Sequence, residues 1–232
     1  MIIDGQEIEC ITFDLDDTLW LCEPVIMNAE FVFYSWLGEH FPRVTNALSA
    51  NDLVRHRRHF FGDHPEMGHD FSWLRKRWLE DLVQGFGYPP GDRVEEGFEV
   101  FLVARNDVQL FAGADRILEK ASSRYRCGTI TNGNADVARI GIDHYFDFSI
   151  TAATAGASKP SPQIFSAAME AAGVPADRIL HVGDDAERDI RGAANMGMKT
   201  LWINPQGERW KGPGRPDAEI RIISELERFL TH

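Results

Sequence analysis

The sequence contains little cysteine and no long apolar run. Its 232 residues include three cysteines, and none of them belongs to a Cys-x-x-Cys pair. Cys10 and Cys127 lie in apolar, strand-like runs, which is typical of core thiols in a reducing compartment. No window reaches the roughly 20 apolar residues of a membrane span, and acidic residues near the N-terminus argue against a signal peptide. We therefore expect a cytoplasmic protein.

The sequence also lacks an excess of positive charge. It has 24 Lys and Arg against 36 Asp and Glu, a formal net charge of −12. The longest basic cluster, residues 55–59, is typical of a solvated helix face, so we expect no nucleic-acid or membrane partner. A small phosphorylated metabolite stays compatible with this charge, because the local charge at a site matters more than the total. At 44% hydrophobic, the chain can form one large domain or a domain with an insertion.

A cluster of acids follows the first apolar run. Residues 10–13 read Cys-Ile-Thr-Phe, and Asp14, Asp16 and Asp17 come directly after them. Carboxylates gathered at the end of a buried strand are costly unless a cation or a substrate with its metal neutralises them. Because ligands of open α/β sheets bind at the carboxyl ends of the strands, we expect a metal-dependent site here.

Short apolar runs alternate with helical patterns over most of the chain, which favours an α/β fold with a parallel sheet covered on both faces. The predicted strands are Ile8–Phe13, Arg126–Thr131, Phe148–Thr151, Ile179–Val182 and Thr200–Ile203. The predicted helices between them are Gly113–Ser122, Pro162–Ala172 and Ala186–Met196. Residues 206–217 are rich in Gly and Pro and are expected to form a surface loop.

Residues 22–108 break this alternation. They contain helical patterns over Pro24–His40, Asn51–Phe61, Phe71–Phe86 and Asp92–Ala104, with a helix cap expected at Ser49 or Asn51. Four helices with short links indicate a small bundle. We therefore predict one domain from residues 1–21 and 109–232, and an inserted helical bundle at 22–108 above the acids of the first strand.

Four short segments at predicted strand ends carry complementary chemistry. They are Asp14 to Thr18, Thr131-Asn132-Gly133, Lys159-Pro160, and Gly183-Asp184-Asp185 with Asp189. Carboxylates suit Mg²⁺, which prefers oxygen ligands. A hydroxyl, backbone amides and a lysine suit phosphate oxygens. Each segment alone is typical of a turn, a helix cap or a surface position, but a parallel sheet would bring all four to one edge.

Taken in this order, the four segments resemble the haloacid dehalogenase-like hydrolase superfamily. The resemblance implies a Rossmann-like α/β core with an inserted helical cap that sets substrate specificity. Several stretches are further similar to the phosphatases of this superfamily that act on FMN and on 5-amino-6-(5-phospho-D-ribitylamino)uracil. These stretches are Thr12–Leu19, Ile130–Ala135, Ser158–Pro160 and Ile179–Asp185.

The resemblance also implies roles for residues. Asp14 would attack phosphorus and form an aspartyl-phosphate, and Asp16 would act as general acid and then general base. Mg²⁺ would be held by the Asp14 carboxylate, the Asp16 carbonyl and Asp184. The phosphoryl oxygens would be bound by Thr131, the Asn132 backbone amide and Lys159, and Gly133 would belong to the same substrate-binding segment. Asp185 and Asp189 would hold metal waters or Lys159, and Thr18 would brace the turn.

Several alternatives stay open at this point. Sugar-phosphate, phosphoglycolate and nucleotide phosphatases share the core motifs. A 2-haloacid dehalogenase would keep Asp14 but would need neither a metal nor a proton donor two residues on, so Asp16 and Asp184 argue against it. A non-catalytic phosphate sensor is a further alternative. Arg75 or Arg105 is expected to face the site, His181 is expected to be a core histidine, and an apolar helical face could support a homodimer.

Overall fold

A computed structural model describes residues 1–3, 5–89, 91 and 93–230. Within them the chain divides into two compact units, one made of Met1–Leu21 and Gln109–His232 and the other of Cys22–Val108. In the first unit, the stretch before the insertion pairs with the stretch after it. The backbone amide of Phe111 donates to the carbonyl of Leu19 at 2.8 Å, and Trp20 forms an antiparallel bridge with Leu110.

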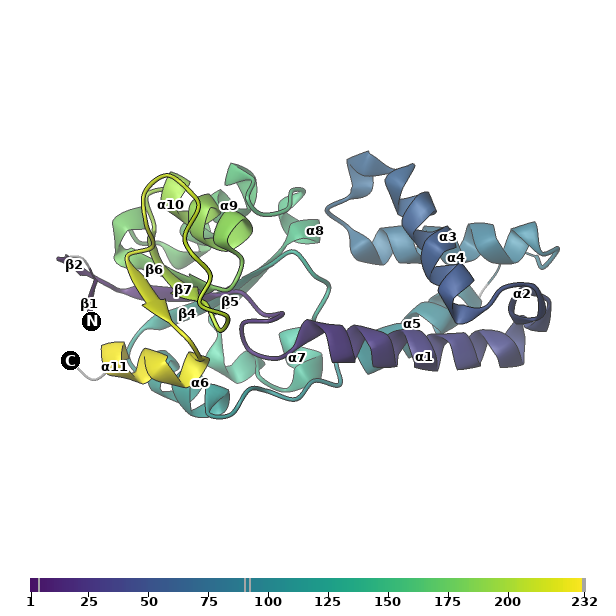
Figure 1. Ribbon diagram of the computed structural model, residues 1–232, viewed down its shortest axis with the longest axis horizontal. Helices are drawn as coiled ribbons and strands as arrows, with labels where there is room; N and C mark the ends of the chain where they lie inside the picture. The colour runs from purple at the N-terminus through teal and green to yellow at the C-terminus, as the bar shows by residue number, and fades with distance from the viewer. Residues whose placement is uncertain (4, 90, 92, 231–232) are drawn as a thin grey trace. The chain divides into compact units, whose positions relative to one another are not determined.

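Within the described residues, the first unit contains a parallel sheet of six strands in the order β5-β4-β3-β6-β7-β8 (Figure 1). Their bounds are β3 (Cys10–Phe13), β4 (Arg126–Thr131), β5 (Phe148–Thr151), β6 (Ile179–Gly183), β7 (Lys199–Ile203) and β8 (Ala218–Ile220). The predicted α/β class is confirmed, and each predicted strand is present within two residues of its expected ends. The sequence analysis missed β8 and a small antiparallel pair, β1 (Ile2–Ile3) and β2 (Gln6–Glu7).

The register of β3 fixes where the acids lie. Phe13 aligns with Thr129 on β4 and with Val182 on β6. Asp14, one residue further, therefore comes level with Ile130 and Gly183. All four β3 residues are buried, as expected for a central strand of a parallel sheet that is covered on both faces. Cys10 and Cys127 are buried and free, which agrees with the expected core thiols, and burial raises the pKa of Cys10 to about 12.

Helices lie on both faces of the sheet, with α9 and α10 on one side and α6 and α11 on the other (Figure 1). The helical bounds are α6 (Ala114–Ser122), α7 (Val137–Ile140), α8 (Ala152–Ala155), α9 (Pro162–Ala172), α10 (Gly192–Asn195) and α11 (Glu227–Leu230). The helix predicted over Ala186–Met196 is divided into a π-helical turn, Ala186–Arg191, and α10. Residues 206–217 contain neither helix nor strand, as predicted, and Trp210 packs edge-on against Trp202.

The second unit is helical. It contains α1 (Cys22–His40), α2 (Pro42–Ala47), α3 (Ala50–Gly62), α4 (Phe71–Gly85) and α5 (Arg93–Arg105). The sequence analysis treated Pro42 only as the end of α1, but it also begins α2 at a position where a missing N–H is tolerated. Ser49 caps α3 in a reciprocal box with Asp52. The expected start at Asp92 lies outside the described residues.

The helical unit has its own apolar core, to which Phe33, Trp36, Trp78, Phe98 and Phe101 contribute. Aromatic side chains of this size supply much of the apolar area that a small bundle buries. None of the helices in the described part of the chain is long and apolar enough to cross a membrane.

Candidate active site

Asp14 is the first residue after the central strand β3. Its backbone amide donates to the carbonyl of Val182 at 2.9 Å, which fixes it between the ends of β3 and β6. The residue is only 6% exposed. Burial raises the pKa of the Asp14 carboxyl, the neighbouring carboxylates of Asp189 and Asp184 raise it further, and the Lys159 ammonium opposes them. Asp14 is thus a buried carboxylate in an acidic neighbourhood.

The chain turns sharply after Asp14. The carbonyl of Leu15 accepts from the amides of Thr18 at 3.2 Å and Leu19 at 2.8 Å. Asp17 has a φ of 60°, in the left-handed region that Asp and Asn tolerate best among non-glycine residues. The Trp20 indole donates to Asp16 Oδ1 at 3.0 Å, so the predicted acid–base residue is held within this turn.

The turn is also joined to the fourth segment. Thr18 Oγ1 donates to Asp184 Oδ1 at 3.3 Å, and the Trp202 indole donates to the Asp184 carbonyl at 2.8 Å. These contacts hold Asp184 at the end of β6, beside the end of β3. The expected bracing role of Thr18 therefore extends to a carboxylate 166 residues away in the chain.

The ammonium of Lys159 lies at the centre of the buried charges. Its Nζ donates to Asp14 Oδ1 at 2.5 Å, to Asp189 Oδ1 at 2.6 Å and to the carbonyl of Ile130 at 2.7 Å. An ammonium has three donors, so each is used. Burial alone would lower the pKa of Lys159, but Asp14 and Asp189 outweigh that effect and raise it. Lys159 is therefore a permanent positive charge next to Asp14.

Asp189 holds Lys159 from the other side. Its Oδ1 accepts from Lys159, and its Oδ2 accepts from the backbone amide of Asp185 at 3.0 Å. Burial alone would raise the pKa of Asp189, but Lys159 and His181 hold it well below its usual range. A Cβ on Gly183 would lie 2.5 Å from the Asp189 carboxyl carbon, so only glycine allows this approach. The Asp185 side chain accepts from the amides of Glu187 and Arg188 and so caps the π-helical turn.

The segment that follows β4 binds the backbone of Lys159. The Asn132 side chain accepts from the Lys159 amide at 2.6 Å and donates to the Lys159 carbonyl at 3.0 Å. Thr131 is 1% exposed, and its hydroxyl accepts from the Gly133 amide at 3.1 Å. The sequence analysis assigned only a backbone amide to Asn132. Its side-chain role was missed because the partner lies 27 residues away.

His181 was also missed as part of this network. It is fully buried, as a core histidine would be, but its ring contacts Thr12 and Asp189. No local pattern in the sequence distinguishes this position from an ordinary strand interior, because both contacts depend on the pairing of distant strands.

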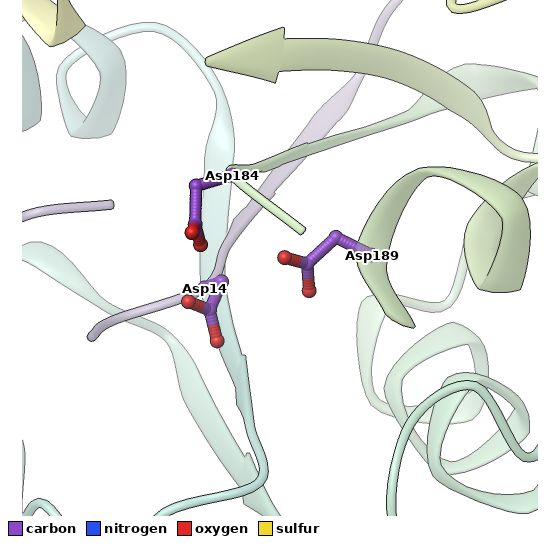
Figure 2. A group of neighbouring side chains, drawn as sticks. All are labelled: Asp14, Asp184 and Asp189. Atoms are coloured by element: carbon purple, nitrogen blue, oxygen red, sulfur yellow. The ribbon is translucent and has the colours of Figure 1, made fainter. Parts of the chain in front are cut away.

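A divalent cation fits the remaining carboxylates. Ligand oxygens of Asp14, Asp184 and Asp189 lie within 4.8 Å of one another (Figure 2). Both oxygens of Asp189 already accept hydrogen bonds, which leaves Asp14 and Asp184 as the better ligands. Burial, with Asp189 and Asp17, raises the pKa of Asp184 to about 7. A bound cation would favour the ionised carboxylate that burial and the neighbouring acids disfavour. Mg²⁺ prefers oxygen ligands of this kind.

Arg75, one of the two arginines expected to face the site, makes contacts within the helical unit. The Arg75 guanidinium donates to Glu30 Oε1 at 2.5 Å, and Arg57 contacts the other oxygen at 2.5 Å. Arg75 also lies 3.3 Å above the centre of the Phe101 ring. Arg105, the other candidate, is buried at the end of α5.

Comparisons with known proteins agree with this architecture. A model of the haloacid dehalogenase-like hydrolases matches residues 8–197. The chain is 30% identical over 231 residues to the 5-amino-6-(5-phospho-D-ribitylamino)uracil phosphatase YigB of Escherichia coli (strain K12), covering 96% of each chain. It is 35% identical to a glyceraldehyde 3-phosphate phosphatase of Pyrococcus furiosus, covering 97% and 92%. The crystal structure of a 2-haloacid dehalogenase from Pseudomonas syringae pv. Tomato DC3000 superposes with a TM-score of 0.89 at 39% identity, covering 96% and 98%.

Proposed function

Because the chain belongs to the haloacid dehalogenase-like hydrolases, we propose that it is a magnesium-dependent phosphomonoesterase acting on a small phosphorylated metabolite. The observation that carries the proposal is the convergence of Asp14, Lys159 and Asp184 at one edge of the sheet. Asp16, two residues after Asp14, adds a proton donor that a phosphatase needs. Relatives named as phosphatases support the same class.

In the first half-reaction, an oxygen of Asp14 attacks phosphorus while the ester oxygen leaves. Asp16 gives its proton to the departing alkoxide, and an aspartyl-phosphate forms on Asp14. In the second, Asp16 takes a proton from the water that attacks phosphorus, and inorganic phosphate leaves as Asp14 is regenerated. The Trp20 indole, at 3.0 Å from Asp16 Oδ1, would keep the carboxyl oriented for both transfers.

Charge on the phosphoryl group is balanced by residues already in place. Lys159 supplies a fixed positive charge, and the Thr131 hydroxyl, which accepts from the Gly133 amide, supplies a nearby donor. Mg²⁺, held by Asp14 and Asp184 with the Asp16 carbonyl, would reduce the repulsion between the carboxylate and the phosphate. Asn132 fixes the backbone of Lys159 and so keeps the ammonium in position.

Within this class, we propose FMN or the ribitylamino-uracil phosphate as substrates to be tested first. The similarity to YigB over nearly the whole chain supports this choice. The glyceraldehyde 3-phosphate phosphatase relatives support a sugar phosphate or another short phosphorylated metabolite as the rival. The helical unit, residues 22–108, is proposed to make the distinction.

The test is phosphate release by the purified protein. p-Nitrophenyl phosphate should be hydrolysed with Mg²⁺, not with excess EDTA, and again after Mg²⁺ is returned. A panel of FMN, the ribitylamino-uracil phosphate, glyceraldehyde 3-phosphate, phosphoglycolate and nucleotides then ranks substrates by kcat/KM. Lack of turnover across the panel, or turnover unaffected by EDTA, would contradict the proposal.

A second candidate, 2-haloacid dehalogenase, is favoured by the name of the Pseudomonas syringae structure. In that reaction Asp14 would displace halide from carbon, and water would then hydrolyse the ester. Halide release from 2-chloropropionate in the presence of EDTA, without phosphate release from any ester, would select this reaction.

A further inference from the structure

A buried polar pair lies on the two central strands beneath the site. Thr12 on β3 and His181 on β6 are register partners, and both are fully buried. Thr12 Oγ1 lies 2.9 Å from His181 Nδ1. The ring of Phe165 from α9 packs edge-on against the imidazole, with the ring centres 5.7 Å apart. The imidazole is therefore held in one place by a strand, a hydroxyl and an aromatic ring.

The other nitrogen of the imidazole points to the charged group of the site. His181 Nε2 lies 3.3 Å from Asp189 Oδ1. This same oxygen accepts from Lys159 Nζ at 2.6 Å, and Nζ lies 2.5 Å from Asp14 Oδ1. A continuous chain of contacts thus runs from Thr12 through His181, Asp189 and Lys159 to the proposed nucleophile.

The chemistry of the partners determines which nitrogen carries the proton. Asp189 acts as an acceptor, because its Oδ1 accepts from the Lys159 ammonium and its Oδ2 accepts from the Asp185 amide. Nε2 must therefore be the protonated nitrogen, and Nδ1 accepts from the Thr12 hydroxyl. Burial lowers the pKa of His181, which favours the neutral ring. A neutral donor can orient Asp189 without cancelling the charge that Asp189 presents to Lys159.

We propose that His181 is a positioning residue that acts through Asp189 to set how the Lys159 ammonium is shared between Asp189 and Asp14. This inference rests on the proposed function for its kinetic consequence. If Asp189 were free to turn, Lys159 would pair more closely with Asp14 and reduce its availability as a nucleophile. The effect should therefore fall on the chemical step and leave substrate affinity little changed.

Two substitutions of His181 separate positioning from simple packing. The amide nitrogen of Gln can take the place of Nε2 and donate to Asp189, whereas the shorter Asn side chain reaches only the place of Nδ1. His181→Asn should lower kcat about 10- to 100-fold with KM within about 3-fold, since a small misplacement of a reacting group has a large effect on rate. His181→Gln should recover most of that loss. Equal kcat values in the two variants, or a loss confined to KM, would overturn the proposal.

A matched threonine pair provides the control. Thr12→Val removes the donor to Nδ1 and should lower kcat severalfold. Thr129→Val makes the same change at an equally buried position on β4, where the hydroxyl contacts Ser149 at 2.7 Å. It should lower the melting temperature by a similar amount and leave kcat unchanged. A similar loss of kcat in both variants would assign the effect to packing and contradict the proposal.

A measurement without substrate distinguishes this inference from the proposed function. In the protein labelled with ¹⁵N-histidine, the signal absent from His181→Gln identifies His181. Its nitrogen shifts should show the Nε2–H tautomer, and Asp189→Asn should change them. The opposite tautomer would overturn the inference even if the enzyme is a phosphatase. The expected tautomer with no phosphatase turnover would support the contact and reject only the proposed reaction.

Discussion

At the scale of single residues, the site is a balance of buried charge. One ammonium, Lys159, contacts the carboxylates of Asp14 and Asp189. The Asp184 carboxylate is the one we expect a cation to neutralise. Such a group is costly to bury unless every charge has a partner. Each residue is therefore expected to affect either chemistry or metal binding in a manner that its contacts define.

Asp14→Asn should abolish phosphate release, with a fall in kcat of at least about 1,000-fold, because an amide oxygen is a poor nucleophile for phosphorus. The variant should keep the far-ultraviolet circular dichroism of the parent. Asp17→Asn is the matched control, because Asn tolerates the left-handed backbone of that position, and its kcat should stay within about 2-fold. Turnover by Asp14→Asn at the parental rate would eliminate the proposed nucleophile.

Asp184→Asn should stabilise the protein in EDTA while removing its response to Mg²⁺. The pKa of Asp184 is raised to about 7 in the folded state, from an ordinary value of 3.8. Its ionisation therefore costs stability as pH rises from about 4 to above 7, and Asn avoids this cost. We expect the variant to gain on the order of 1–3 kcal/mol at pH 8 and nothing at pH 4.

Thermal melting against pH checks this expectation. Mg²⁺ at 100 times its dissociation constant should add about 2.7 kcal/mol to the parent and much less to Asp184→Asn. An equal gain from Mg²⁺ in both proteins would exclude Asp184 as a ligand.

At the scale of elements, the strands and helices with strong patterns were predictable and the short ones were not. The strand Arg126–Thr131 and the helix Pro162–Ala172 occur where the sequence analysis expected them. The three-residue strand β8 is too short to show an alternation of apolar and polar residues. The π-helical turn depends on Asp185, whose carbonyl accepts from the amides of both Asp189 and Ile190. Apolar runs that end in acids located Asp14 and Asp184, but Lys159 does not follow a strand directly, because α8 lies between β5 and Lys159. The contacts of His181 and of the Asn132 side chain join segments that are distant in the sequence, and no local pattern encodes them.

A substitution of Gly183, at the end of β6, would show how closely β6 must approach the π-helical turn. Gly183→Ala would place a Cβ 2.5 Å from the Asp189 carboxyl carbon. We expect a loss of about 1–3 kcal/mol of stability and a fall in kcat as Asp189 is displaced. Gly85→Ala, in α4 with nothing within 4 Å of the added Cβ, should be neutral or slightly stabilising. Urea unfolding and kcat are the measurements, and unchanged values for Gly183→Ala would show that the turn can yield.

At the scale of the whole molecule, two units with separate cores carry different kinds of buried charge. The sheet unit gathers carboxylates, whereas the helical unit places Arg57 and Arg75 on one carboxylate, Glu30. The sequence predicted a helical insertion from its missing strands, but not this pairing, because it joins three helices. The expected homodimer and the lack of a nucleic-acid partner stay predictions for solution measurements.

Glu30 should make the helical unit sensitive to acid. Burial alone would raise the pKa of Glu30, but Arg75 and Arg57 outweigh it and lower the pKa from 4.5. The stability that Glu30 contributes is thus present above about pH 4.5 and is lost as pH falls through the lowered pKa.

Glu30→Gln should cost about 3–5 kcal/mol at pH 7, because the buried guanidinium of Arg75 and the partly buried guanidinium of Arg57 lose their partner. The difference from the parent should vanish in strong acid. Denaturant unfolding at several pH values measures it, and Glu80→Gln, at a more exposed pair with Arg77, is the control that should change much less. A loss of stability that does not depend on pH would refute the electrostatic explanation.

The residues on either side of the insertion, Leu19–Trp20 and Leu110–Phe111, form paired stems, and this pairing affects how the insertion can change in evolution. Phe111 bonds to Leu19 and Trp20 bridges to Leu110 within the sheet unit itself, so the two attachment points are tied together regardless of what lies between them. The segment from 22 to 108 is thus inserted between two ends that the sheet unit already holds together. Evolution or an engineer could graft another insert onto the same stems and alter molecular recognition while the reaction chemistry is inherited intact.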